Sequence, residues 1–160
     1  DHMKTVFDPS ESLVFVSPDA GGVERARAFA KRLNASVAMI DKRRTAPNVA
    51  KAMHLVGSVK DQVAVILDDM IDTAGTLVLA AQKMKEKGAR SIRAFATHPI
   101  LSGNAIERID RSPITELVVT DSVPFVNQSD KIKILSVAQL FATAIQAVNM
   151  NRSISTSFVF

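Results

Sequence analysis

Residues 62–77 read QVAVILDDMIDTAGTL and combine two patterns that call for separate explanations. The first half is a short, continuous apolar run, which is typical of a strand covered on both faces of a parallel sheet. The second half places the carboxylates of Asp68, Asp69 and Asp72 within five residues, together with two threonines and one glycine. Because like charges so close together repel one another, folding alone does not explain them. We therefore expect a ligand at the end of this strand.

The rest of the chain repeats the alternation of apolar runs and helical periodicity. We expect strands at 13–16, 37–40, 62–67, 92–96 and 116–119, a small strand near 55–56 and a late edge strand at 154–160. Helices are expected at 23–33, from 77 to a stop at Gly88, at 105–109 and at 137–148. This order predicts an α/β fold with a mainly parallel sheet flanked by helices, in which ligands bind at the carboxyl ends of the strands.

Composition limits the classes of protein to consider. A length of 160 residues with 47% apolar and 22% charged residues is typical of one globular domain with a core. No apolar run reaches the roughly 18 residues of a membrane-spanning helix, and the first residues lack the layout of a secretory signal. The absence of cysteine excludes disulfides, thiolate metal sites and a cysteine nucleophile. We expect a cytoplasmic protein without a membrane partner.

The formal charge of +4 raises the question of a nucleic-acid partner. Tryptophan and tyrosine are absent, so only phenylalanine could stack on bases, and the basic residues are spread along the chain except at Lys42-Arg43-Arg44. Small phosphorylated ligands attract the same charge. We therefore expect no nucleic-acid partner.

The 72–76 segment is the first candidate site. Four of its residues lie where the predicted helix begins: Thr73, Ala74, Gly75 and Thr76. The free backbone N–H groups and the positive end of the helix can hold a phosphate there, and Gly75 permits close approach. Asp68 and Asp69, at the strand tip, suit vicinal sugar hydroxyls or a hydrated Mg²⁺. The segment thus indicates a sugar phosphate, whereas the alternative interpretation makes Asp72 a helix N-cap and the other acids an exposed strand end.

The 17–22 loop, SPDAGG, repeats this design after the first strand. Gly21 and Gly22 leave room for a diphosphate, and Asp19 could hold the metal ion that bridges it. Pro-Asp and Gly-Gly also form ordinary turns, so this interpretation is less specific.

Lys42, Arg43 and Arg44 follow a predicted strand, in a polar stretch over 41–52 that we expect to be a loop. A mobile loop could bring such cations to a transferring phosphoryl group and stabilise its charge. The alternative is a charge run that is merely solvated.

Several motifs together resemble one known family. The stretch VILDDMIDTAGT at 65–76 is similar to the phosphoribosyl-binding fingerprint of type I phosphoribosyltransferases. With VSPDAGG at 16–22 and DKRR at 41–44, the chain resembles the ribose-phosphate pyrophosphokinases, a family also called phosphoribosyl diphosphate synthetases. THPILSG at 97–103 and SIS at 153–155 also fit it, so the resemblance runs from about residue 13 to the end.

The resemblance implies a reaction. That family transfers the diphosphoryl group of MgATP to the 1-hydroxyl of ribose 5-phosphate, which gives phosphoribosyl diphosphate and AMP. By resemblance, the 72–76 segment binds the 5-phosphate, and Asp68 and Asp69 bind the ribose hydroxyls.

The remaining roles concern the metal ion and the transferred group. By resemblance, Asp19 is a ligand of Mg²⁺, and Gly21 and Gly22 lie beside the diphosphate. Lys42 is the catalytic cation on a flexible loop, assisted by Arg44.

The family's chains are about twice as long and have two similar halves, of which this sequence resembles the second. Asp1-His2-Met3 resembles a cloning remnant, so we expect one phosphoribosyltransferase-like domain over 4–160. The resemblance places most ATP-binding residues in the other half, so we expect this chain to be an inactive fragment that carries the ribose 5-phosphate site. It also implies a homo-oligomer.

Two other functions stay open. A salvage phosphoribosyltransferase would share only the stretch 68–76 and would need a hood that recognises a base, for which the sequence has no spare segment. A non-catalytic regulatory homologue of the kinase is the other possibility. The presence of Lys42, Arg44 and Asp19 argues against it, because a regulatory copy does not need catalytic cations.

Overall fold

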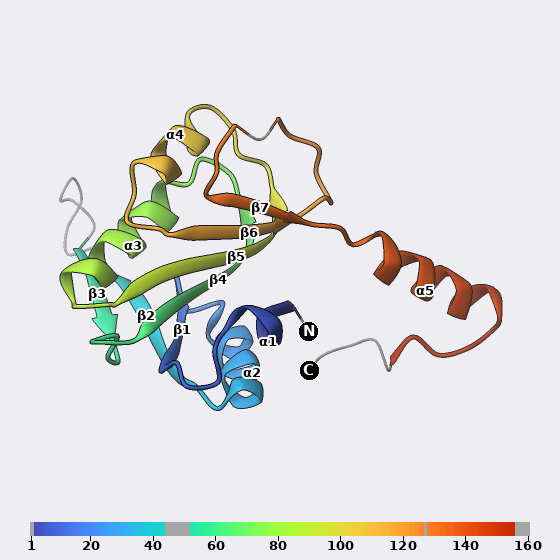
Figure 1. Ribbon diagram of the computed structural model, residues 1–160, viewed down its shortest axis with the longest axis horizontal. Helices are drawn as coiled ribbons and strands as arrows, with labels where there is room; N and C mark the ends of the chain where they lie inside the picture. The colour runs from blue at the N-terminus through green and yellow to red at the C-terminus, as the bar shows by residue number, and fades with distance from the viewer. Residues whose placement is uncertain (1, 44–51, 127, 156–160) are drawn as a thin grey trace.

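A single sheet organises the protein. The computed structural model describes residues 2–43, 52–126 and 128–155. Within these ranges a seven-stranded sheet has the order β3-β2-β1-β4-β5-β6-β7. All neighbouring strands are parallel except β2 and β3. Helices α1 and α2 lie on one side of the sheet and α3 and α4 on the other (Figure 1). The predicted α/β fold with a mainly parallel sheet is confirmed.

The elements have these bounds. The strands are β1 (Leu13–Ser17), β2 (Ser36–Arg43), β3 (Ala52–Val56), β4 (Val63–Ile71), β5 (Ser91–Pro99), β6 (Glu116–Thr120) and β7 (Ile132–Leu135). The helices are α1 (His2–Val6), α2 (Val23–Leu33), α3 (Gly75–Glu86), α4 (Ala105–Asp110) and α5 (Ala138–Asn149). None of the helices in the described ranges is long and apolar enough to cross a membrane.

Both faces of the sheet are buried, as the continuous apolar runs predict. On β1, Val14 and Val16 pack into the core that α3 and α4 cover, whereas Leu13 and Phe15 pack into the core that contains α2. Successive side chains of a strand point to opposite faces, so an unbroken apolar strand supplies both cores.

The strand order fixes where a ligand can bind. Strand β1 lies between β2 and β4. After β1 the chain adds β2 and β3 on one side of it, and then β4 to β7 on the other side. At such a switch point the loops after the two neighbouring strands diverge and leave a crevice at their carboxyl ends. The 17–22 loop follows β1 and the 72–76 segment follows β4, and both are therefore at this crevice.

Strand β4 is longer than the sequence predicted. It continues to Ile71, which places Asp68 and Asp69 within the strand rather than in a loop after Leu67. Neighbouring β5 continues beside it, so that Asp68 pairs with Ala96 and Ile71 pairs with Pro99. The ladder with β5 and the burial of Ile71 outweigh the low strand propensity of the acids.

The predicted loop over 41–52 is wrong at its two ends. Strand β2 continues to Arg43 and pairs with antiparallel β3, with Lys42 opposite Met53. Ladder pairing tolerates charged residues here because β2 and β3 form the edge of the sheet. Arg44, the second predicted cation, lies outside the described residues.

Three further differences concern short elements outside the central strands. The short elements α1 and β7 were not predicted. The predicted strand at 154–160 falls mostly outside the described residues, and its first two residues, Ile154 and Ser155, are not in a strand.

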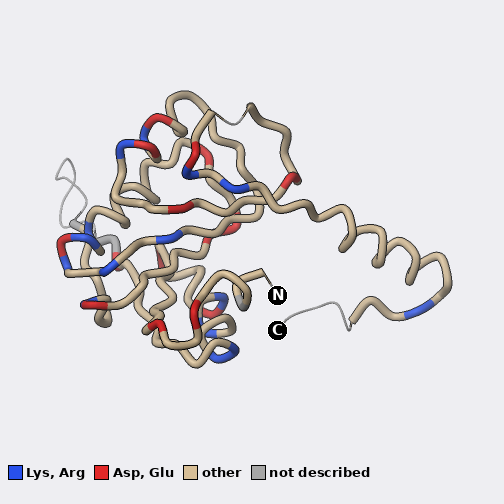
Figure 2. Tube along the Cα trace, viewed as in Figure 1, with Lys and Arg blue, Asp and Glu red and all other residues tan. Residues whose placement is uncertain are grey.

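Helix α5 differs from the other helices in its surroundings. It extends away from the sheet (Figure 1) and carries no charged residue (Figure 2). None of its residues is buried, and large apolar side chains such as Leu140, Phe141 and Ile145 are more than half exposed, at 55%, 59% and 67%. The predicted helix therefore exists, but its apolar residues cover nothing within the described structure.

Candidate functional site

The two loops at the crevice line one cavity. Its volume is about 230 Å³, and it is lined by Asp19 after β1, by Asp68 on β4 and by residues 70–77. A neighbouring hollow is lined by Asp19, Gly21, Gly22, Asp68 and Asp69. The structure thus brings together predicted residues that lie about fifty positions apart in the sequence.

The 72–76 segment presents the uncapped start of α3. The helix begins at Gly75 with Ala74 as its N-cap residue, and no described side chain caps its first turn. The backbone N–H groups of that turn are therefore available to an anion, and the positive end of a 12-residue helix points to it. Asp72 is not the N-cap, because Ala74 occupies that position, and the carboxylate of Asp72 instead accepts a hydrogen bond from the Ser102 hydroxyl. The alternative interpretation of Asp72 as a cap is wrong.

The 17–22 loop is closed by its own residues. The Gly22 N–H donates to Asp19 Oδ1 at 3.2 Å, and the Ser17 hydroxyl donates to the carbonyl oxygen of Asp19. A Cβ atom at Gly22 would lie only 2.6 Å from Ser17 Oγ, and Ser17 is fully buried. Glycine is required here by close packing, whether or not a diphosphate binds beside it.

The two adjacent acids of β4 differ in their affinity for protons. Burial raises the pKa of Asp68 from 3.8 to about 6, and the negative charges of Asp69 and Asp19 add to this effect. Burial also acts to raise the pKa of Asp69, but hydrogen bonds from its neighbours and the charge of Arg25 outweigh it and lower that pKa. The carboxylate of Asp69 is therefore the more firmly ionised acceptor.

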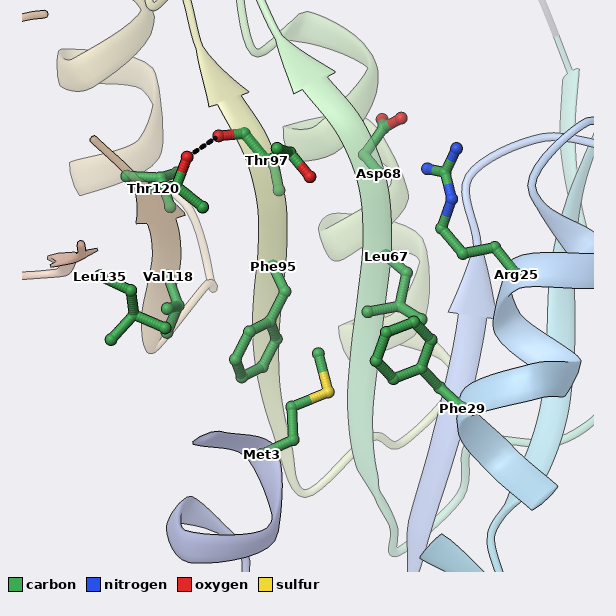
Figure 3. Close-up of a pocket in the computed structure, with 12 residues that line it drawn as sticks. Met3, Arg25, Phe29, Leu67, Asp68, Phe95, Thr97, Val118, Thr120 and Leu135 are labelled. Carbon is green, nitrogen blue, oxygen red and sulfur yellow. Dashed lines mark hydrogen bonds between the residues drawn. The ribbon is translucent and has the colours of Figure 1, made fainter. Parts of the chain in front are cut away.

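Arg25 belongs to the site, although it was not identified as a site residue from the sequence. Its guanidinium Nη2 lies 3.5 Å from Asp69 Oδ2. Figure 3 shows the Arg25 side chain extending from α2 toward Asp68, near the carboxyl end of β4. The available signal was its position in the first turn of the helix that follows the 17–22 loop.

A second pocket of about 230 Å³ lies below Asp68 on the face of the sheet that α1 and α2 cover. Met3, Phe29, Leu67 and Phe95 make its floor apolar (Figure 3). Asp68 and Arg25 stand at its polar end (Figure 3), so Asp68 lines both this pocket and the cavity of the 72–76 segment. An apolar floor does not suit a phosphate, which leaves the 72–76 segment as the anion site.

The predicted catalytic cations are only partly placed. Lys42 is on β2 and follows Met39, which pairs with Ser17 at the end of β1. The backbone of Lys42 therefore extends past the last residue of β1. It is therefore at the same end of the sheet as the 17–22 loop.

A magnesium ion would find suitable donors at Asp19. The described residues include no group of three or more Asp, Glu, His or Cys side chains arranged around a metal position. Mg²⁺, however, usually keeps several waters and binds through one or two carboxylates and the phosphates of a substrate. The carboxylate of Asp19 beside the anion cavity fits that donor set.

Most of the chain is similar to proteins of one known family. Residues 44–159 match the family model described as the phosphoribosyl synthetase-associated domain. The chain belongs to this family. A ribose-phosphate pyrophosphokinase from Clostridium tetani is 49% identical over 154 residues, which are 95% of this chain and 48% of that protein. The chain spans about half the length of the curated relatives it matches.

Solved structures agree with this phosphoribosyl synthetase assignment. The crystal structure of phosphoribosylpyrophosphate synthetase from Mycobacterium smegmatis matches with a TM-score of 0.86 and 33% identity, over 94% of this chain and 49% of that chain. An adenine phosphoribosyltransferase from Thermoanaerobacter pseudethanolicus matches with a TM-score of 0.52 and 16% identity over 74% of each chain, which shows a shared fold only. The resemblance to the ribose-phosphate pyrophosphokinases and the type I phosphoribosyltransferase fold are confirmed.

Proposed function

We propose that this chain carries the ribose 5-phosphate site of a ribose-phosphate diphosphokinase. The observation that carries the proposal is the uncapped start of α3, which shares one cavity with Asp68 and Asp19. An anion site and sugar-hydroxyl acceptors in the same cavity match the two ends of a sugar phosphate. The reaction is transfer of the diphosphoryl group of MgATP to the 1-hydroxyl of ribose 5-phosphate.

Each part of the sugar phosphate has a partner in this proposal. The 5-phosphate accepts from the N–H groups and hydroxyls of the 72–76 segment. The ribose hydroxyls donate to Asp68 and Asp69, and the contact of Arg25 with Asp69 holds that acceptor in place. A sugar bound at both ends is oriented for in-line attack, which is a major part of catalysis of phosphoryl transfer.

The diphosphate side of the site uses the other loop. Asp19 would hold Mg²⁺, which when bound neutralises charge on the transferred group. Gly21 and Gly22 leave space for that group, and Lys42 and Arg44 supply cations for the charge of the transition state. The ATP donor requires further residues, which the family's other half is expected to supply.

The test is AMP formation from MgATP and ribose 5-phosphate. We expect no AMP from the 160-residue chain alone and activity once the other half is joined to it. In that longer protein, Lys42→Ala should lower turnover by orders of magnitude and leave the affinity for ribose 5-phosphate nearly unchanged. Rapid AMP production by the chain alone would contradict the fragment proposal, and an unchanged Lys42→Ala rate would contradict the role of that cation.

A regulatory homologue would give a different result in the same assay. It would bind ribose 5-phosphate but form no AMP even when joined to the other half. The salvage alternative would instead form a nucleotide from phosphoribosyl diphosphate and a free base.

We also propose that the protein forms homo-oligomers. The exposed apolar residues of α5 support this proposal, because contiguous apolar surface of this kind commonly marks an interface. Sedimentation at high concentration should show dimers or larger species, and Ile145→Glu should shift them toward the monomer. A strictly monomeric wild-type profile would contradict this expectation.

A further inference from the structure

The 72–76 segment is tied to a part of the chain that follows it by about thirty residues. The turn after β5 donates two backbone hydrogen bonds at the start of the segment. Leu101 N–H donates to the carbonyl of Ile71, the last residue of β4, at 3.0 Å, and Ser102 N–H donates to the Asp72 carbonyl at 3.1 Å. The Ser102 hydroxyl also donates to the Asp72 carboxylate. One residue, Ser102, thus holds both the backbone and the side chain of Asp72.

Arg108 of α4 adds a second tie at the next residue. Its Nη1 donates to the carbonyl oxygen of Thr73 at 3.0 Å. The same nitrogen is 3.8 Å from where a Cβ of Gly75 would be, so the guanidinium lies against the segment. It does not line the cavity itself.

The backbone of this region needs such ties. Ala74 has φ 59°, and Leu101 of the facing turn has φ 49°. Residues with a Cβ adopt this left-handed conformation at a cost in free energy, and they keep it only where the surrounding contacts fix it. Ser102 and Arg108 form hydrogen bonds with Asp72 and Thr73, the two residues directly before Ala74.

We propose that Ser102 and Arg108 are positioning residues that preset the 72–76 segment for its anion, and that the carboxylate of Asp72 anchors this clamp instead of contacting the phosphate. This inference rests on the proposed function and adds the device that shapes the site. A carboxylate directed at a dianion would repel it, whereas a carboxylate engaged by Ser102 fixes the loop. A loop already held in its binding conformation loses less entropy when a ligand binds.

The test is binding of inorganic phosphate to the 160-residue chain, measured by calorimetry. Ser102→Ala and Arg108→Gln should each weaken binding about threefold to tenfold, and Ser102→Thr, which keeps the hydroxyl, should bind like the wild type. Arg111→Gln is the matched control for Arg108. It removes the same charge from the neighbourhood of α4, but Arg111 pairs with Glu107 at 2.7 Å.

A second measurement reports on the loop without any ligand. Backbone ¹⁵N relaxation dispersion of residues 73–76 should show new microsecond-to-millisecond exchange in Ser102→Ala. Ser122→Ala is the control, because its hydroxyl donates to the Thr97 carbonyl at 3.0 Å and does not contact the 72–76 segment. It should leave that exchange unchanged.

The outcomes separate this inference from the proposed function. Wild-type affinity and unchanged loop dynamics in Ser102→Ala and Arg108→Gln would overturn the clamp, while a wild-type protein that binds phosphate would keep the proposed function. Equal weakening by Arg108→Gln and Arg111→Gln would also overturn the clamp, since net charge alone would explain it. Absence of phosphate binding in the wild type would overturn both.

Discussion

The two loops at the crevice are held in different ways. The 17–22 loop is closed by contacts between residues no more than three positions apart, such as Gly22 N–H to Asp19. The 72–76 segment depends on Ser102, thirty positions from Asp72, and on Arg108, thirty-five positions from Thr73. One loop is therefore shaped by its own sequence, and the other by the turn and the helix beside it.

The glycines of the two loops show the same contrast. A Cβ at Gly22 would clash with the buried Ser17 hydroxyl, whereas a Cβ at Gly75 would have no neighbour closer than 3.8 Å. Packing thus requires glycine at position 22 but not at position 75. We infer that Gly75 instead allows the ligand to approach the backbone closely.

Gly22→Ala should have the largest effect on stability. The added methyl group would be 2.6 Å from Ser17 Oγ, so backbone and side chain must shift. We expect the free energy of unfolding to fall by about 1–3 kcal/mol, the range for overpacking a tight site. Urea unfolding measures it.

Gly75→Ala is the matched control in the same experiment. Its added methyl group meets only ordinary contacts, so the free energy of unfolding should change by less than about 0.5 kcal/mol. Equal losses at both positions would contradict the contrast between the loops.

Asp68→Asn should change stability in a way that depends on pH. The pKa of Asp68 in the folded protein, about 6, is above the ordinary value of 3.8, so the folded state binds this proton more tightly than the unfolded state. The stability contributed by this group is present below about pH 4 and is lost as the pH rises toward 6. At pH 7.5, without Mg²⁺, Asn should raise the free energy of unfolding by about 1–2 kcal/mol, after allowance for solvent screening.

The same substitution should be nearly neutral near pH 3.5, where Asp68 is protonated in the folded state and mostly protonated in the unfolded state. Asp69→Asn serves as the comparison, because the pKa of Asp69 is lowered and its charge stabilises the fold. It should give no gain at pH 7.5. A pH-independent gain from Asp68→Asn would show that burial of its charge is not the cause.

The smallest expected effect concerns ligand approach at the 72–76 segment. Gly75→Ala should weaken binding of inorganic phosphate a few-fold, under about 1 kcal/mol, because a methyl group would stand beside the helix N–H groups. Calorimetry on the folded variant measures this change. Unchanged affinity would mean that the phosphate does not approach Gly75.

The sequence predicted those features that depend on neighbouring residues. Continuous apolar runs predicted most of the strands. The rule that ligands bind at the carboxyl ends of parallel strands predicted that Asp19, Asp68 and the 72–76 segment lie near one another. The end of β4 was missed because the ladder with β5, not the local composition, extends that strand to Ile71.

The partners of the site were missed for the same physical reason. Arg25, Ser102 and Arg108 act through contacts between distant parts of the chain. Arg25 follows the 17–22 loop and Ser102 lies within the 97–103 motif, but neither position in the sequence shows which residue the side chain contacts. Only the packing of α2 and α4 at the ends of the strands reveals these contacts.

The most direct test of the proposed site is a calorimetric comparison of ribose 5-phosphate, inorganic phosphate and ribose on the 160-residue chain. If the 72–76 segment binds the phosphate while Asp68 and Asp69 accept from the hydroxyls, ribose 5-phosphate should bind at least several-fold more tightly than phosphate, and ribose most weakly. Thr76→Val should weaken the binding of both ribose 5-phosphate and inorganic phosphate. Of these two ligands, Asp69→Asn should weaken the binding of ribose 5-phosphate only. Equal affinities for ribose 5-phosphate and phosphate, or no effect of Thr76→Val, would contradict the proposed site.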